Sequence, residues 1–424
     1  NPLTFFNYTF STGETIDSLY VKGNISDAYD FETDNYISLH LYRIDSIFKD
    51  SVIFNDRPTY IANSLDSTSY QFQNIKEGKY LIIALKDVDN NYFFDPFYDK
   101  IGFIDSLITL PRDSIIDFRL FKEETALIWD KPHFINSEKI GFGYYGKLDL
   151  KNIEIESSIP DSIQYTFTKE YEKDTLNFWL SKNSFDSLNF NLIEKDTTKL
   201  ITVKFDRARD TLIDSLSISP KTTNVIHLKE TFKLSSNIPL KNIRDSLITI
   251  RDIDSLVVPF TTSINDNLDE IDIKFEVSPS DNYRIFILPE SIKDIRGVVN
   301  DTLEYSVVSQ SIEDYGNVYL DIIRNSESKF ILHMINSNGD IIRKFNNVSE
   351  NSTYNFEYIR PGKYTFRLIE DSNNNNIWDT GNYLRKVNPE AVYYFSNEIE
   401  VRANWDLNEI FDLNQTQIIK DSIN

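Results

Sequence analysis

The chain has 424 residues and a formal net charge of −22, from 44 basic and 66 acidic side chains. This excess of acidic groups argues against binding nucleic acid or anionic lipid by bulk charge, because the phosphates would be repelled. The sequence has no cysteine, so disulfides, thiol catalysis and cysteine-held metals are excluded.

Strands are predicted wherever apolar and polar side chains alternate. In chain order, the clearest examples are residues 201–205, 271–277 and 364–368. In each of them every second residue is apolar, so one face packs on a core and the other meets solvent. Such strands recur about every 8–12 residues, and no helix longer than a turn or two is convincing, which is typical of antiparallel sandwiches.

Composition supports the same fold class. Aromatic residues make up 14% of the chain, and only 12 residues are glycine, so turns must rely on Asn and Asp. The longest apolar run, Tyr80 to Leu85, is far shorter than the roughly 18 residues that span a bilayer. We therefore predict an all-β chain built as a string of tandem antiparallel β-sandwich domains.

An internal repeat organises the chain. Residues 70–95 and 354–379 align without a gap, as YQFQNIKEGKYLIIALKDVDNNYFFD and YNFEYIRPGKYTFRLIEDSNNNNIWD. The shared Gly-Lys-Tyr and the shared aspartates and asparagines make a chance match improbable. Each copy reads as a strand, a tight turn at glycine, a second strand and an acidic, asparagine-rich loop.

Domain boundaries follow from the position of the two copies. Residues 1–12 read as the final strand of an earlier domain, because they are similar to residues 300–309, which end the domain before the second copy. At about 100–200 residues per domain, the remainder divides into four sandwich units and a polar tail. The units are 13–122, 123–222, 223–312 and 313–413, and the tail is 414–424.

Two module types resemble parts of this pattern. The Gly-Lys-Tyr strands with the acidic loop resemble transthyretin-like modules, including the carboxypeptidase regulatory-like family. Residues 223–312 resemble an SbsA-type bacterial Ig-like domain, through the strand Thr231 to Leu234, the segment Asn237 to Leu240 and the turn Asp294 to Gly297.

The order of modules, with STGETIDSL at 11–19 and WDTGNYLRKVNPE at 378–390, is similar to Ig-like domain-containing lipoproteins of Bacteroidota, especially flavobacteria. This resemblance implies an outer-membrane lipoprotein, lipid-anchored on the extracellular face. The anchoring cysteine and a first Ig-like domain would lie upstream of Asn1. It also implies a non-catalytic protein whose partners are integral outer-membrane β-barrel proteins and other surface lipoproteins.

The tripeptide Asp-Ser/Thr-aliphatic occurs many times and resembles the O-glycosylation sequon of Bacteroidota. An alternative is that Asp-Ser forms a turn and the aliphatic residue begins the next strand. The candidate acceptors are Ser18, Ser106, Ser187, Ser246 and Thr302.

Each repeat loop also has the spacing of the first part of an EF-hand calcium loop, with oxygen ligands at positions 1, 3, 5, 7 and 9. Position 6, usually glycine, is Tyr92 or Asn376, and Asp99 could add a carboxylate to the first loop. The alternative is a turn held by its own Asx bonds without metal, and a bound Ca²⁺ would be structural. The candidate ligands are Asp87, Asp89, Asn91, the Phe93 carbonyl and Asp95, and then Asp371, Asn373, Asn375, the Ile377 carbonyl and Asp379.

No catalytic motif is present. The four histidines are far apart in sequence, and no G-x-S-x-G, Walker-type or G-x-G-x-x-G pattern occurs. Among the aromatic clusters, Phe94 and Trp378 hold equivalent repeat positions and predict a shared core anchor. Tyr393 and Tyr394 are candidates for stacking on a sugar.

The sequence therefore predicts a non-catalytic, surface-exposed accessory subunit of an outer-membrane protein complex. The β-barrel protein assembly machinery is favoured, and a secretion translocon or a transporter is the next choice. We expect partners to brace the junctions of the string, because contacts between isolated tandem domains are small. The alternative is a glycan-binding surface protein of a polysaccharide-uptake system.

Overall fold

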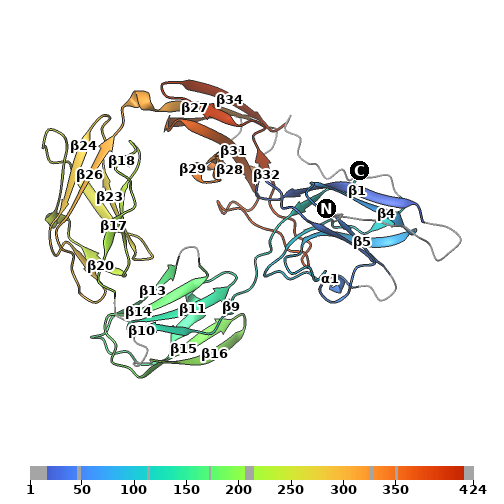
Figure 1. Ribbon diagram of the computed structural model, residues 1–424, viewed down its shortest axis with the longest axis horizontal. Helices are drawn as coiled ribbons and strands as arrows, with labels where there is room; N and C mark the ends of the chain where they lie inside the picture. Colours follow the sequence, from blue (N-terminus) through green and yellow to red (C-terminus); the bar gives the residue numbers. More distant parts are fainter. Residues whose placement is uncertain are drawn as a thin grey trace, which may run out of the picture.

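The computed structural model describes residues 17–44, 49–111, 115–170, 173–205, 214–324, 328–348 and 352–414. Their regular structure is almost all β-strand, arranged as four sandwiches (Figure 1). The predicted all-β class is thus confirmed. The described helical segments are single turns, among them α1 (Val52–Asn55), and none is long and apolar enough to cross a bilayer. Residues 1–12 and nearly all of the tail 414–424 lie outside the described residues.

The first sandwich packs a three-stranded sheet, in the order β4-β1-β8, against a sheet in the order β3-β2-β5-β6, with β7 also paired to β5. Its core lies between the two sheets and includes Phe72, Tyr80 and Phe118. The strands are β1 (Leu19–Asp27), β2 (Ser38–Arg43), β3 (Tyr60–Asn63), β4 (Ser69–Ile75), β5 (Gly78–Lys86), β6 (Lys100–Phe103), β7 (Ile108–Leu110) and β8 (Phe118–Leu120).

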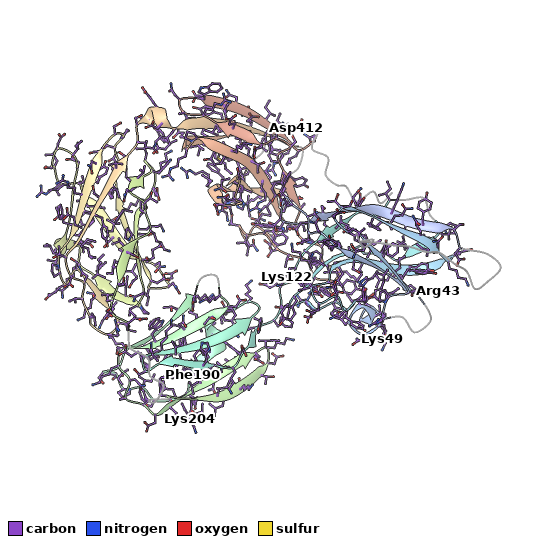
Figure 2. The ribbon with its side chains drawn as sticks, in the orientation of Figure 1. Arg43, Lys49, Lys122, Phe190, Lys204 and Asp412 are labelled. Carbon is purple, nitrogen blue, oxygen red and sulfur yellow. The ribbon has the colours of Figure 1, made fainter. Side chains whose placement is uncertain are left out.

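The second sandwich packs the sheet β10-β11-β14-β13, with β9 on β11, against the sheet β12-β15-β16. Phe190, labelled in Figure 2, contacts the rings of Phe142 and Phe178 at centroid distances of 5.0 and 5.2 Å. The strands are β9 (Ile128–Trp129), β10 (His133–Asn136), β11 (Lys139–Tyr145), β12 (Ile153–Ile155), β13 (Tyr165–Glu170), β14 (Thr175–Leu180), β15 (Ser187–Glu194) and β16 (Thr197–Lys204).

The third sandwich has the sheets β17-β19-β23-β22 and β18-β26-β24-β21, with a short pair, β20-β25, beside them. The alternation read at 271–277 is confirmed, since Ile271, Ile273, Phe275 and Val277 are all buried in this core. The strands are β17 (Ile218–Pro220), β18 (Val225–Ile226), β19 (Phe232–Ser236), β20 (Leu240–Ile243), β21 (Ile248–Arg251), β22 (Phe260–Ile264), β23 (Glu270–Phe275), β24 (Asn282–Ile287), β25 (Ile292–Asp294) and β26 (Leu303–Ser309).

One predicted boundary needs correction. Residues 123–222 were expected to form the second domain, but β17 pairs with β19, from Ile218 opposite Ser236 to Pro220 opposite Leu234. The third sandwich therefore begins before Ile218 rather than at 223. The sequence did not indicate this strand, because the three residues of β17 are too few to show an alternating period.

The fourth sandwich repeats the first strand for strand. Its sheets, β30-β27-β34 and β29-β28-β31-β32 with β33 on β31, have the same connections as those of the first. Even the irregularity early in β1 recurs early in β27, so the repeat covers a whole sandwich and not only residues 354–379. The strands are β27 (Gly316–Ile323), β28 (Lys329–Asn336), β29 (Ile341–Val348), β30 (Ser352–Ile359), β31 (Gly362–Asp371), β32 (Val392–Tyr394), β33 (Ile399–Val401) and β34 (Asp406–Asp412).

The four sandwiches form a closed ring, in which the fourth returns to the first (Figure 1). The tandem sandwiches expected from the sequence are present, and their closure into a ring was not expected. The second and third sandwiches meet through Trp179, Ile238 and Ile295. The third and fourth meet through an ion pair of Lys229 with Glu357, 2.8 Å apart, and a bond between the His227 ring and the Tyr358 carbonyl. The chain thus braces its own junctions.

Candidate functional site

The contact that closes the ring is made by residues 380–388, which follow the second acidic loop. In the first repeat copy only residues 96–99 separate the acidic loop from the next strand, whereas in the second copy residues 380–391 do so. Tyr383 from this longer connection is fully buried among residues of the first sandwich. Its ring meets that of Phe103 edge to face at 5.4 Å, and its hydroxyl donates to the Asp50 carbonyl at 3.1 Å.

Polar bonds surround this buried tyrosine. Glu123 accepts the Tyr383 backbone N–H at 2.5 Å and the Asn382 amide at 3.2 Å, and burial raises the pKa of the Glu123 carboxyl while the Tyr383 N–H opposes the shift. The Thr380 hydroxyl donates to the carbonyl of Lys122 at 2.6 Å, where the first sandwich leads into the second (Figure 2). The fourth sandwich therefore bonds both the first sandwich and the linker that leaves it.

The outer face of β5 explains why the first sandwich accepts this segment. Leu81, Ile83 and Leu85 point away from the sandwich core and are buried in a second apolar cluster, which also contains Tyr383. Burying apolar area on both faces is worth roughly 25 cal/mol per Å², so this strand needs cover on both sides. The unbroken run from Tyr80 to Leu85 was the sequence signal for a second contact, because a strand with one wet face alternates.

Arg367, on the corresponding face of β31, makes a second contact across the junction. Its guanidinium lies 4.1 Å from the centroid of the Tyr29 ring and donates to the Tyr29 hydroxyl at 2.8 Å. The Tyr394 hydroxyl donates to the Tyr29 carbonyl at 2.7 Å. The repeat position that is Ile83 in the first copy is thus a buried cation in the second, held by aromatic rings.

The aromatic candidates have different roles from those expected. Phe94 is buried and packs on Phe54 at 5.5 Å, but Trp378 covers Tyr29 across the junction at 4.8 Å. The prediction of one shared core anchor is therefore wrong, because neither ring lies in the core of its own sandwich and both pack in the apolar cluster outside β5. Tyr393 packs against the fourth core, whereas Tyr394 belongs to the junction.

Two buried histidines are held uncharged. Burial lowers the pKa of His40 to about 4, with the nearby Asp87 carboxylate opposing the shift. Burial and then the neighbouring Arg367 lower the pKa of His333 to about 4 as well. A general base for chemistry near neutral pH has its pKa near that pH, so neither ring is tuned for this task.

The two acidic loops adopt the same turn. Both oxygens of the Asp87 carboxylate accept backbone N–H groups, from Asn91 at 3.2 Å and Tyr92 at 2.7 Å. Asp371 does the same with Asn375 and Asn376, at 3.0 and 2.9 Å. The residues at the usual glycine position have positive φ, 67° for Tyr92 and 63° for Asn376, so the loops keep the EF-hand-like backbone without glycine.

The predicted calcium ligands are largely occupied by this turn. Asn373 and Asn375 donate their side-chain amides to Asp379, at 2.6 and 2.8 Å, and Asp95 accepts the Phe97 N–H. Among the described residues no three acidic or histidine side chains converge as a metal site would require. The donor sets as arranged fit Asx turns better than a cation.

The five glycosylation candidates share one setting. Each hydroxyl residue is exposed, and each stands at or shortly before the start of a strand. This setting suits the turn and the sequon alike, because turns are where a glycan fits. The candidates are Ser18 before β1, Ser106 before β7, Ser187 at β15, Ser246 before β21 and Thr302 before β26.

Comparison with known proteins gives distant structural similarity alone. The sequence matches no protein-family model, and no curated protein matches it. Among solved structures, SGBP-B of the Bacteroides ovatus mixed-linkage glucan utilization locus, solved with a mixed-linkage heptasaccharide, is 12% identical over 94% of this chain and 99% of its own, with a TM-score of 0.19. BcpA, the major pilin subunit of Bacillus cereus, is 10% identical over 93% and 99%, with a TM-score of 0.17. The Escherichia coli alpha-2-macroglobulin domains MG0-NIE-MG1 are 13% identical over 45% and 89%, with a TM-score of 0.21.

Proposed function

We propose that this chain is a non-catalytic scaffold at the cell surface, an accessory subunit of an outer-membrane protein complex. The β-barrel protein assembly machinery is the favoured complex, with a secretion translocon or a transporter next. The proposal includes a lipid anchor and O-linked glycans on the exposed turn residues, such as Ser106. It places the chain on the extracellular face, next to integral barrel proteins and other surface lipoproteins.

Closure of the ring supports this proposal. A chain of tandem sandwiches with small contacts would bend at each linker, but here Tyr383 and Arg367 tie the fourth sandwich to the first. The relative positions of the outer surfaces are thereby held without a partner. A scaffold needs this property, because a preorganised surface loses less conformational freedom on binding.

Co-purification tests the proposal. Extraction of the native protein in mild detergent should recover integral barrel proteins with it, and Tyr383→Ala should reduce that recovery by opening the ring. Leu384→Ala is the matched control, since Leu384 is the exposed neighbour of Tyr383. Recovery of the wild-type chain as a solitary monomer would refute the scaffold role. An intact mass of the native protein equal to that of the polypeptide alone would refute the proposed glycans.

A further inference from the structure

A groove runs along the junction of the first and fourth sandwiches and has a volume of about 630 Å³. This volume is within the range of about 300–1,000 Å³ typical of small-ligand sites. One wall is the loop between β1 and β2 together with Lys100, and the other comes from residues 335–339, 363–367 and 394–398 of the fourth sandwich. The groove exists only because the ring closes, so neither repeat copy contains it alone.

An exposed aromatic ring stands at this groove. Phe31 is 71% exposed, and its ring meets Tyr394 edge to face at 5.2 Å. The loop that carries Phe31 is anchored at its base, because one Asp27 oxygen accepts the N–H groups of Tyr29 and Asp30, at 2.8 and 2.9 Å. This exposed ring offers a flat apolar face at the groove on which a ligand ring could stack.

The polar groups of the groove are neutralised or unengaged. Lys100 lies 2.7 Å from Asp27 and 2.8 Å from Asp34, and Lys363 pairs with Glu398 at 2.7 Å. The two lysines of the lining are therefore already paired with carboxylates of the chain itself. An anionic ligand would meet these carboxylates, and Glu32 as well. The other cation of the lining, Arg367, is 4% exposed, and its Nη atoms are already bonded to Tyr29, Tyr394 and His333.

Amide groups line the same wall. Asn338 and Asn397 line the groove and are exposed, and within the described residues their side-chain amides have no hydrogen-bond partner. Each amide offers two donors and an acceptor, which suits the paired hydroxyls of a sugar ring. A deeper cation, Arg367, also lines the groove, and its Nε is buried with no hydrogen-bond partner.

We infer that this groove binds a short, neutral oligosaccharide. One sugar ring stacks on Phe31, and its hydroxyls bond Asn338 and Asn397. The apolar ring face supplies the stacking surface and the amides supply orientation. The carboxylates paired with the lysines repel phosphate, sulfate and uronate groups. This site goes beyond the scaffold role, because a ligand here would contact both ends of the chain at once and favour the closed ring.

A glycan array of neutral and acidic oligosaccharides, probed with the full-length chain, tests the inference. We expect neutral oligosaccharides to bind and acidic ones to fail. A titration of the protein with the best neutral oligosaccharide, monitored by saturation-transfer NMR, should give one binding site per chain. Phe31→Ala should weaken binding about tenfold, since stacked aromatic pairs contribute beyond their buried area, and Asn338→Ala should weaken it as well.

Tyr165→Ala is the matched control, because Tyr165 is an exposed aromatic residue of the second sandwich and should leave binding unchanged. Phe31→Ala should still co-purify with barrel proteins, so failure of this site and failure of the scaffold role are distinguishable. The inference is overturned if no neutral oligosaccharide binds, if Phe31→Ala binds as the wild type does, or if acidic oligosaccharides bind equally well.

Discussion

At the scale of single residues, the two repeat copies differ at the positions that decide their contacts. Ile83 and Arg367 occupy the same place on equivalent strands, yet one is buried under an apolar cluster and the other is held between Tyr29 and His333. Phe94 and Trp378 are another such pair. Shared residues such as Tyr80 and Tyr364 keep their roles, since each hydroxyl donates to the carbonyl four residues earlier. Residues that are identical in the two copies thus maintain the fold, and residues that differ make the contacts at the junction.

The buried His40 predicts a loss of stability in acid. Its pKa falls from 6.5 to about 4 on folding. Below pH 6.5 the imidazole of the unfolded chain is therefore protonated, whereas that of the folded chain stays neutral down to about pH 4. Stability should therefore decline as the pH falls through this window, by up to about 3 kcal/mol for this group. Denaturant unfolding of His40→Gln at several pH values should show a shallower decline than the wild type.

His133→Gln, at an exposed histidine of the second sandwich, is the control for the loss of a histidine elsewhere in the chain. An equal slope in His40→Gln and the wild type would contradict the prediction. The absolute stability of the variant is not the readout, since Gln also changes the bonds to Ser38 and Tyr42.

At the scale of elements, strands and acidic loops could be read from the sequence because their causes are local. Alternation along 364–368 places Tyr364, Phe366 and Leu368 in one core, as expected from the two-residue period of a strand. The loops follow from Asp and Asn, which accept backbone N–H groups a few residues ahead. Short strands such as β17 were missed because three residues show no period.

The acidic loops predict that Asp371→Ala destabilises the fourth sandwich whether or not calcium is present. Asp371 is 2% exposed, and its loss removes the acceptor of the Asn376 N–H and one of the two acceptors of the Asn375 N–H. Losing a hydrogen bond to a charged group costs roughly 1.5–3 kcal/mol. Thermal unfolding in millimolar Ca²⁺ and in chelator should show the same drop in Tm.

Ile377→Ala is the control in this loop, because its side chain is exposed and only its carbonyl was a candidate ligand. A drop in Tm for Asp371→Ala that appears only with Ca²⁺, together with stabilisation of the wild type by Ca²⁺, would instead establish a calcium site of the predicted kind.

At the scale of the whole molecule, ring closure changes what the chain can present. A string of sandwiches offers side surfaces whose relative positions vary. The ring fixes them through contacts between the second and third, the third and fourth, and the fourth and first sandwiches. The closing contact rests on a longer connection, residues 380–391, in the second copy. The longer connection in the second copy therefore joins the two repeat copies, and the groove lies beside their junction.

Tyr383→Ala should open this ring. Removing a buried aromatic side chain costs about 3–5 kcal/mol. Each of the surrounding surface bonds contributes about 1 kcal/mol or less, so Tyr383 is the largest single contribution to this contact. The chain lacks cysteine, so spin labels at Lys76→Cys and Lys241→Cys report on the first and third sandwiches alone. Pulsed electron–electron double resonance between the two labels should give one narrow distance distribution in the doubly labelled parent chain. The same chain with Tyr383→Ala should give a broad distribution.

Tyr383→Phe loses only the bond to the Asp50 carbonyl and should keep the narrow distribution, as should Leu384→Ala. A narrow distribution with Tyr383→Ala would show that the other contacts, around Arg367 and Tyr29, are enough to hold the ring.

The sequence by itself determined what depends on neighbouring residues: the all-β class, the alternating strands, the acidic turns and the duplication that relates 70–95 to 354–379. Its net charge of −22 and its lack of cysteine also set the kinds of ligand and chemistry that are open to it. Only the tertiary structure decided that the chain forms a ring, that Tyr383 closes it, and that Phe31 and Asn338 line one groove. Contacts between residues more than 300 positions apart depend on how whole sandwiches meet, and no local period in the sequence records that geometry.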